Sequence, residues 1–303
     1  MNDIALLVMS CDKYSSAWYP YFELIKKYWP DHPQKVYLST ETRTYCTQGI
    51  DIITINSNCV EPWSKRLYDV LNHISEEYII FSLEDFFLLG QVDSQRIKES
   101  LRWMRENKTI AEVRFSTFET VESGEVYKSS DFRICPKEHR YRIDTQFALW
   151  RKSFLISILN QNETPWQFEV RASDRSRILH NILLWFSPED PVNISTMIVP
   201  YYNGWTEGYG IGWGKWRPKN KQWFLQNGIK GVKYSELGIL SENDIARRKK
   251  YLYVNPTSFT RKFIKEIFQI WVFADRAVRE LFITGPKGFK NIVCILKSRN
   301  NKA

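Results

Sequence analysis

Residues Tyr78–Phe87 have the sequence YIIFSLEDFF, and this stretch decides the fold class of the chain. Its first part, Tyr78–Leu83, is a short apolar run without a helical repeat, which predicts a buried β-strand. The run ends at two adjacent acids, Glu84 and Asp85. A strand of this kind is typical of a sheet that is covered on both faces.

Predicted strands and helices alternate on both sides of this stretch. Further strands are expected at residues 4–9, 36–40, 52–55 and 113–116, and helices at 18–28, 62–76 and 94–106. This alternation predicts an α/β fold with a mixed, mostly parallel sheet covered by helices. Ligands of such sheets bind beyond the carboxyl ends of the strands, so the loops after Met9, Thr40 and Leu83 are the expected binding region.

Glu84 and Asp85 are the strongest candidates for a catalytic site. Carboxylates at a strand end hold a divalent cation, Mn or Mg, between themselves and a diphosphate. The cation then neutralises the leaving phosphate when a sugar bond breaks. We therefore predict that both residues bind metal and that Asp85 is needed for catalysis. The alternative is that both acids cap the following turn in solvent.

Polar and basic residues upstream are candidates for binding a nucleotide diphosphate. Ser10, Asp12 and Lys13 directly follow the first predicted strand, and Arg66 lies early in the helix that precedes the acidic strand. A nucleotide diphosphate needs polar or acidic partners for its base or ribose and cations for its phosphates. We therefore expect these residues to contact the donor. The alternative is that the charged ones are ordinary surface groups.

A third candidate group combines an acid with tryptophans. Glu169 follows the motif PWQF at Pro165–Phe168. An acid beside aromatic residues suits a general base that removes the proton of a sugar hydroxyl. Trp150 and Trp166 are expected to stack on the acceptor. The alternative is that the tryptophans fill the core and that Glu169 caps a turn or pairs with Arg171.

Glycines and aromatic residues are concentrated in the segment Gly204–Trp216. Glycine allows a backbone to approach a ligand closely and allows a loop to move. We expect the segment to close over the donor, with Lys215 on a phosphate and Trp213 against the acceptor. The alternative is a flexible surface loop, but exposed tryptophans favour a binding role.

The composition describes a globular body with a basic tail. The chain has 303 residues and is 43% hydrophobic, which is enough for one large domain. Its net charge is +9, and residues 257–303 contain 10 basic and 3 acidic side chains, so the rest is nearly neutral. We expect a catalytic domain at 1–256, with a donor half at about 1–120 and an acceptor half at about 121–256, and a basic tail at 257–303. Nucleic-acid binding is not expected, because the charge is confined to the tail.

The tail has the sequence features of a membrane-surface segment. Ser258–Ile283 has apolar residues at helical spacing, with lysine and arginine around them. Aromatic and basic residues together suit the headgroup layer of an anionic bilayer. The alternative is that the apolar face packs on protein. No signal peptide is recognisable and the cysteines show no zinc or redox spacing, so we expect a cytoplasmic protein, peripheral on the inner face of the membrane.

The order of these motifs resembles a group of bacterial glycosyltransferases with the glycosyltransferase-A fold. The motifs are SCDKY, WSKR, LEDFF, QFALWR and PWQFE, and they fall within residues 4–220. Relatives of that group are typically encoded with capsule, lipopolysaccharide or other surface-glycan pathways. The resemblance implies that Glu84–Asp85 stands at the metal-binding Asp-x-Asp position, although this chain has Glu-Asp-Phe there. It also implies that Glu169 is the acceptor-activating acid of an inverting enzyme and that Arg66 faces the donor nucleotide.

The sequence therefore predicts a hexosyltransferase that moves a sugar with inversion from a nucleotide-sugar, a UDP-sugar, to a glycan or lipid-linked acceptor. A nucleotidyltransferase is the alternative enzyme, since it uses a similar acidic metal site. Such enzymes normally carry a glycine-rich loop after the first strand, whereas Ser10–Tyr14 lacks glycine. A non-catalytic carbohydrate-binding protein is the other alternative, although such modules are usually all-β.

Overall fold

The computed structural model describes residues 3–57, 61–115, 124–128, 130–187, 196–202, 210–241 and 243–244. The chain forms two compact units, Met1–Leu240 and Ser241–Ala303. The first unit contains the helices and strands that position the candidate site. The predicted basic tail at 257–303 lies outside the described residues, so its helix remains a prediction.

An eight-stranded sheet forms the centre of the first unit, with the strand order β3-β2-β1-β4-β8-β6-β9-β7. The strands are β1 (Ile4–Met9), β2 (Lys35–Thr40), β3 (Ile52–Asn56), β4 (Tyr78–Leu83), β6 (Ile110–Arg114), β7 (Phe132–Ile134), β8 (Ala148–Arg151) and β9 (Ile182–Phe186). Neighbouring strands from β3 to β4 are parallel, as are β6 and β9, whereas β8 and β7 run antiparallel to their neighbours. The predicted class, an α/β fold with a mixed and mostly parallel sheet, is confirmed.

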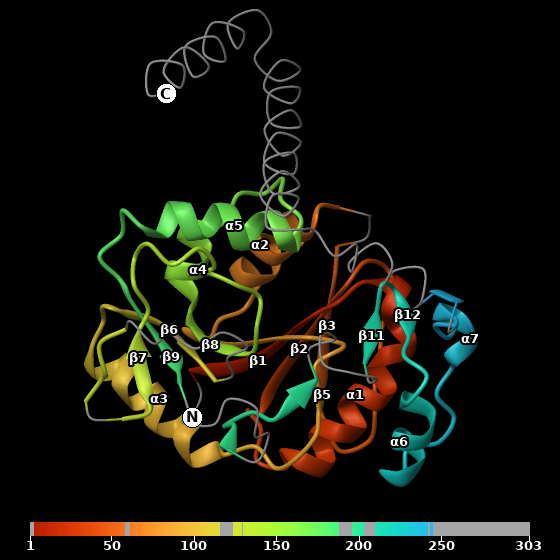
Figure 1. Cartoon of the computed structure of the whole chain (residues 1–303). Coiled ribbons are helices and arrows are strands. Elements are labelled where there is room, and N and C mark those ends of the chain that lie inside the picture. The colour runs from red at the N-terminus through yellow and green to blue at the C-terminus, as the bar shows by residue number, and fades with distance from the viewer. Residues whose placement is uncertain are drawn as a thin grey trace, which may run out of the picture. The chain divides into compact units, whose positions relative to one another are not determined.

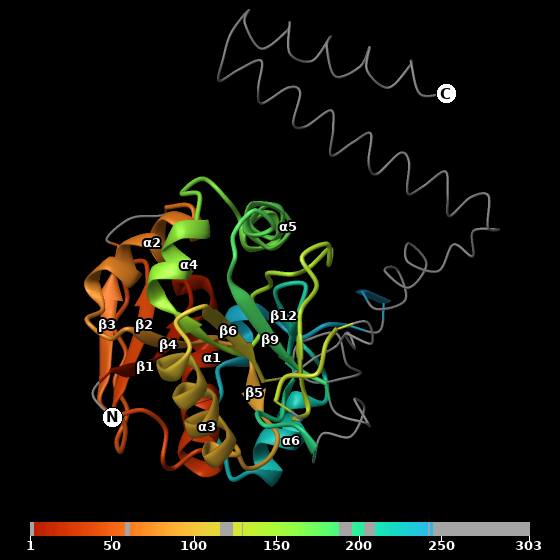
Figure 2. The same ribbon diagram turned by 90° about the vertical axis from the view of Figure 1, so that its left-hand side faces the viewer.

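The sheet is the middle of three layers, because its side chains alternate between two faces. In β1, Leu6 and Val8 join one hydrophobic cluster, and Ala5 and Leu7 join the other. The first face is covered by α1 (Ser15–Tyr28), α3 (Ser94–Glu106) and α6 (Asn220–Gln226), and the second by α2 (Trp63–His73), α4 (Lys152–Ile158) and α5 (Pro165–Ser176) (Figures 1 and 2). All of β1 is therefore buried, as its apolar run predicts.

The antiparallel strand β8 brings a distant segment to the binding edge. Its first residue, Ala148, pairs with Phe81 near the carboxyl end of β4 and with Arg114 at the carboxyl end of β6. An antiparallel strand begins at the edge where its parallel neighbours end. Residues 144–146 therefore lie at the same edge of the sheet as residues 84 and 85.

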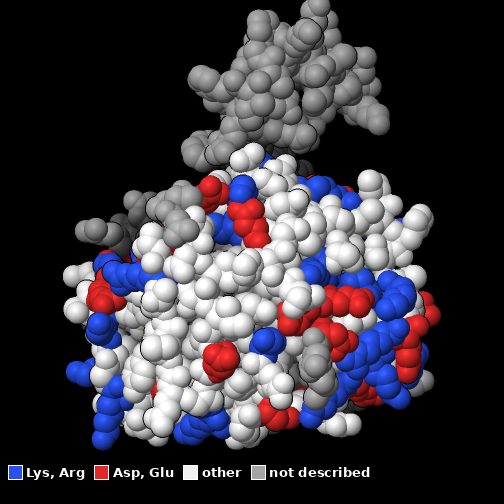
Figure 3. All heavy atoms as spheres, turned by 180° about the vertical axis from the view of Figure 1, so that it is seen from behind, with Lys and Arg blue, Asp and Glu red and all other residues white. Residues whose placement is uncertain are grey.

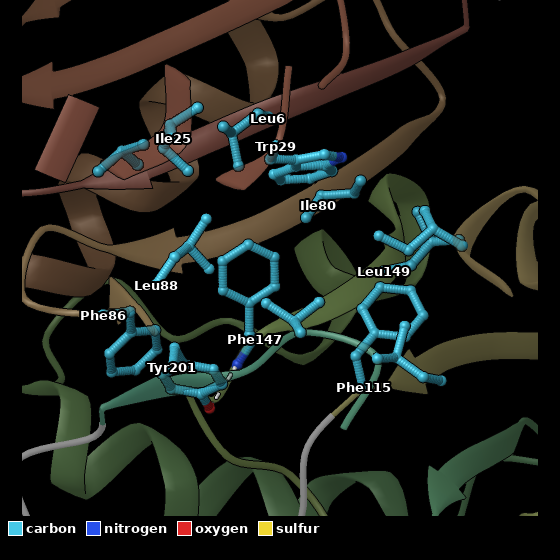
Figure 4. Close-up of a cluster of buried hydrophobic side chains, with 14 of the residues drawn as sticks. Leu6, Ile25, Trp29, Ile80, Phe86, Leu88, Phe115, Phe147, Leu149 and Tyr201 are labelled. Atoms are coloured by element: carbon cyan, nitrogen blue, oxygen red, sulfur yellow. Dashed lines mark hydrogen bonds between the residues drawn. The ribbon is translucent and has the colours of Figure 1, made fainter. Parts of the chain in front are cut away.

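Two small ladders lie beyond this edge. β5 (Phe87–Leu88) pairs with β10 (Tyr201–Tyr202), and β11 (Ile211–Gly212) pairs with β12 (Lys215–Trp216). The Phe86 and Tyr201 rings lie 4.6 Å apart, and the Tyr201 hydroxyl accepts a hydrogen bond of 3.2 Å from the backbone N–H of Phe147 (Figure 4). This packing fixes the chain directly after Asp85.

Opposite charges alternate along the exposed side of α3. Arg105 pairs with Asp3, and Arg102 lies 3.7 Å from Glu99 and 4.0 Å from Glu106. Figure 3 shows basic and acidic side chains interleaved over this part of the surface. Such a mixed surface is typical of a solvated helix face. Among the described helices, none has the length and apolarity needed to cross a bilayer.

Candidate active site

The carboxyl ends of β1 and β4 form a switch point in the sheet. The chain passes from β1 through α1 to β2 on one side of β1, and later places β4 on its other side. Ligands of open α/β sheets bind in the crevice beyond two such strands. Met9 pairs with Leu83, so Ser10 and Glu84 follow side by side at this edge. The fold thus brings together two groups of predicted site residues that are far apart in the sequence.

Glu84 and Asp85 form an acid pair in this crevice. Glu84 is 7% exposed, and Asp85 is half-buried. Burial, together with the charge of Asp85, raises the pKa of Glu84 well above its usual value, although Arg66 and the Ser10 hydroxyl act in the opposite direction. Burial also raises the pKa of Asp85 to about 6. Adjacent desolvated carboxyls of this kind favour either a retained proton or a bound cation.

Arg66 and Tyr14 lie beside the acid pair. Arg66 is buried, and its Nη1 donates a hydrogen bond of 2.5 Å to the backbone oxygen of Ser10. Its Nε has no hydrogen-bond acceptor among the described residues. Burial, followed by the charge of Glu84, raises the pKa of Tyr14 to about 12, which keeps the phenol neutral and able to donate. Tyr14 is absent from the predicted site residues, although it ends the SCDKY motif that contains three of them.

Asp12 holds the loop after β2 in place. Its carboxylate accepts hydrogen bonds of 3.0–3.2 Å from the backbone N–H groups of Glu41, Thr42 and Arg43. Burial acts to raise the pKa of Asp12, but the hydrogen bonds from this loop outweigh it and lower the pKa. Asp12 therefore positions the loop beside the switch point. Its direct contact with a donor remains a prediction.

Helix α5 carries the predicted general base to the same edge. The helix starts after Thr164, whose side chain forms a capping box with Gln167. Glu169 Oε1 accepts hydrogen bonds from the backbone N–H and the hydroxyl of Thr145, at 3.0 and 2.7 Å. Because Thr145 precedes β8, Glu169 lies over the edge at which the acid pair emerges. Trp166 is one turn earlier on the helix and 73% exposed, so its ring is accessible to an acceptor.

A buried ion cluster supports this part of the edge. Arg114 Nη1 pairs with Asp144 at 2.8 Å, and its Nε pairs with Glu112 at 3.2 Å. The guanidinium carbon also lies 3.7 Å from the centroid of the Trp185 ring. Asp144 is therefore the closer counter-ion of Arg114. Burial raises the pKa of Glu112 to about 8, even though the charge of Arg114 acts to lower this pKa. Because Asp144 directly precedes Thr145, the cluster fixes the segment that holds Glu169.

We expect Glu112 to lower the free energy of unfolding as the pH rises from about 5 to about 8. In the unfolded chain its carboxyl ionises near the ordinary pKa of 4.5, whereas the folded protein keeps the proton up to about pH 8. The folded state therefore binds more protons across this window and loses stability with rising pH, by at most about 1.4 kcal/mol per pH unit. Glu112→Gln should remove this slope. Urea unfolding across the window measures it.

The charged groups that face Glu112 are Arg114, Asp144 and Arg142. Their contacts stay the same in Glu112→Gln, because the glutamine oxygen can accept the hydrogen bond from Arg114 Nε, so the comparison isolates the titrating proton. The variant should gain stability over the wild type steadily toward pH 8. A variant that is less stable than the wild type throughout the window would instead show that Glu112 is ionised and paired with Arg114.

Trp150 is a core residue, so the prediction that its ring stacks on an acceptor is wrong. All four residues of β8 are buried, and Trp150 is 1% exposed. Its ring stacks on Phe154 of α4, with the centroids 6.2 Å apart. The strand lies between β4 and β6 and under a helix layer, so no face of the Trp150 ring reaches solvent.

The predicted donor-closing segment contributes a hairpin beside the loop after β1. Residues 204–209 lie outside the described residues, and 210–216 include β11 and β12. A Cβ on Gly214 would lie 3.2 Å from Lys13 Nζ and 3.7 Å from the Tyr14 hydroxyl, so the turn of the hairpin approaches that loop closely. Lys215 directly follows the turn, and its contact with a phosphate remains a prediction.

The chain matches no protein-family model and no curated protein. Among solved structures it is similar to S. aureus TarS 1-349, with a TM-score of 0.43 and 12% identity over 62% of this chain and 58% of that one. It is similar to the mannosyltransferase PcManGT from Pyrobaculum calidifontis in complex with GDP-Man and Mn2+, with a TM-score of 0.43 and 10% identity over 62% and 55% of the two chains. It is also similar to a cytidylyltransferase from Leptospira borgpetersenii, with a TM-score of 0.44 and 9% identity over 84% and 98%. The chain thus matches less than two thirds of the length of the first two structures.

Proposed function

We propose that the protein is a glycosyltransferase that uses a nucleotide-sugar donor, a UDP-sugar. The observation that carries this proposal is the acid pair Glu84–Asp85 at the switch point, with Arg66 and Ser10 beside it. A nucleoside diphosphate gains negative charge as it leaves, and cations and hydrogen-bond donors stabilise that charge. The switch point combines a place for a cation with an arginine and the neutral phenol of Tyr14.

The acid pair fits a divalent cation that is shared with the substrate. Mg²⁺ is usually held by one or two carboxylates together with substrate phosphates, and Mn²⁺ accepts similar oxygen ligands. Within the described ranges, no three His, Cys, Asp or Glu side chains are arranged as metal ligands. Glu84 and Asp85, which share the switch point, would be the protein's ligands. A bound cation would favour their ionised forms and neutralise charge on the diphosphate.

We propose Glu169 as the general base of an inverting transfer. The oxygen of the acceptor hydroxyl attacks the anomeric carbon while the bond from that carbon to the diphosphate oxygen breaks. The electron pair of this bond leaves with the nucleoside diphosphate, and the hydroxyl proton passes to Glu169. Thr145 orients the carboxylate through Oε1, and the exposed Trp166 offers its ring to the acceptor sugar.

The proposed transferred group is a hexosyl unit, and the proposed acceptor is a glycan or lipid-linked glycan of a bacterial surface polysaccharide such as capsule or lipopolysaccharide. The motif order within residues 4–220 supports this assignment. The basic composition of residues 257–303 supports a position on the anionic inner face of the membrane, close to a lipid-linked acceptor.

Thermal stabilisation by nucleotides tests the proposed function. In the presence of Mn²⁺, UDP and UDP-sugars should raise the Tm, because a ligand at 100 times its Kd adds about 2.7 kcal/mol to the stability. GDP-sugars extend the panel, and free sugars alone serve as the control that should have little effect. A responding nucleotide sugar should then release its nucleoside diphosphate when a glycan acceptor is added. Stronger stabilisation by CTP, with release of pyrophosphate, would show a nucleotidyltransferase instead.

A further inference from the structure

The tip of the β11–β12 hairpin carries a strained tryptophan. Gly212 pairs with Lys215, so Trp213 and Gly214 form a two-residue turn, and their φ angles are 53° and 75°. Positive φ at both central residues is the geometry of a type I′ turn, in which Asn-Gly is strongly preferred. A bulky residue with positive φ is an outlier, and such strain is concentrated at functional sites.

Trp213 is less buried than the other tryptophan of the hairpin. Its side chain is 44% exposed, whereas Trp216 on the following strand is fully buried. The Trp216 ring stacks on Phe87 at 5.9 Å and contacts Phe224 edge-on at 5.8 Å. Trp216 therefore anchors the hairpin to the first face of the sheet. Trp213 stays partly exposed, in a conformation that a smaller residue would adopt more easily.

Two cationic side chains lie close to this turn. The Arg217 guanidinium carbon is 5.8 Å from the centroid of the Trp213 ring. The same guanidinium packs on Gly212, where a Cβ would lie only 2.9 Å from its Nε. Lys13 lies against Gly214 and belongs to the loop beside the acid pair. A partly exposed aromatic ring with cations near it suits a ligand that combines a planar base with phosphates.

We propose that Trp213 stacks on the base of the donor's nucleoside diphosphate, with Lys13 and Arg217 facing the phosphates. This inference rests on the proposed function. It assigns Trp213 to the donor, whereas the sequence predicted a contact between Trp213 and the acceptor. Figure 1 shows the hairpin beside α1, which directly follows the loop after β1. The glycines at 212 and 214 then serve to bring the hairpin backbone close to Arg217 and Lys13.

Trp213→Asn tests the proposal, because it relieves the strain and removes the ring together. The Tm of the free protein should rise by about 2–5 °C, since Asn-Gly suits the turn. The Kd for UDP, or for GDP if the wild type binds GDP more tightly, should rise about 5- to 100-fold with loss of a base stack. Trp213→Phe retains a ring and should keep most of the affinity. Differential scanning fluorimetry and titration calorimetry with Mn²⁺ measure the two effects.

Lys128→Asn is the matched control. Lys128 is the other non-glycine residue with positive φ in the described part of the chain, at 47°, and it forms an exposed ion pair with Glu106. Its replacement should also raise the Tm and should leave the Kd for the nucleotide unchanged. A Trp213→Asn protein that binds the nucleotide as tightly as the wild type overturns the stacking proposal. A wild type that binds neither UDP nor GDP overturns the proposed function itself.

Discussion

Asp85→Asn is expected to remove nearly all sugar transfer while leaving the folded protein at least as stable as the wild type. The variant keeps the size of the side chain, but the pair no longer offers two anionic ligands beside the diphosphate. Loss of one group that stabilises developing charge lowers turnover by about 10²–10³-fold. Burial raises the pKa of Asp85 to about 6, so above that pH the ionised carboxylate opposes folding, and its removal should not lower the Tm.

Asp69→Asn provides the control for this variant. Asp69 is an exposed aspartate on α2 that pairs with Lys65, and surface pairs of this kind contribute little to stability. Both turnover and Tm should stay close to those of the wild type. Turnover is measured as release of nucleoside diphosphate with acceptor present. If Asp85→Asn transfers sugar at the wild-type rate, the acid pair only caps a turn and the proposed function loses its main support.

The first half of the sheet could be predicted from local sequence. β1 and β4 have their predicted bounds, because a short apolar run that is buried on both faces fits only the interior of a parallel sheet. The strand predicted at 113–116 is instead found at Ile110–Arg114. Glu112 and Arg114 resemble solvent-facing residues in the sequence, but they are buried together in an ion cluster. The partner that makes this burial possible, Asp144, is distant in the chain.

The second half of the sheet depends on such distant partners. β8 runs antiparallel between β4 and β6, and α4 begins at Lys152 directly after it, without a glycine or proline to mark the change. Its residues therefore gave no signal that Trp150 belongs to the core. In the candidate site, too, some residues can be placed from local sequence and others depend on distant packing. Ser10 and the acid pair follow from strand ends, whereas the hydrogen bonds between Glu169 and Thr145 depend on where α5 packs.

Glu169→Gln is expected to lower turnover by about 10²–10⁴-fold while leaving the affinity for the donor unchanged. The glutamine side chain retains an oxygen that accepts both hydrogen bonds from Thr145, so the contact between α5 and the segment before β8 survives. The amide cannot accept the proton of the acceptor hydroxyl. The variant therefore separates proton transfer from helix positioning, and kcat should fall while the Kd for the nucleotide and the Tm stay near their wild-type values.

Glu163→Gln is the matched variant for a structural carboxylate in the same region. Glu163 is 1% exposed and accepts hydrogen bonds from Arg175 through both oxygens, at 2.8 and 2.7 Å. Weakening the buried pair of Glu163 with Arg175 destabilises the protein, so this variant should have a lower Tm. Its kcat should stay the same at a temperature where the variant is folded. The stereochemistry of the product gives an independent check by NMR. A single displacement with Glu169 as base inverts the anomeric carbon, so a product with retained configuration would contradict this role, because retention requires a second displacement or a different path for the proton.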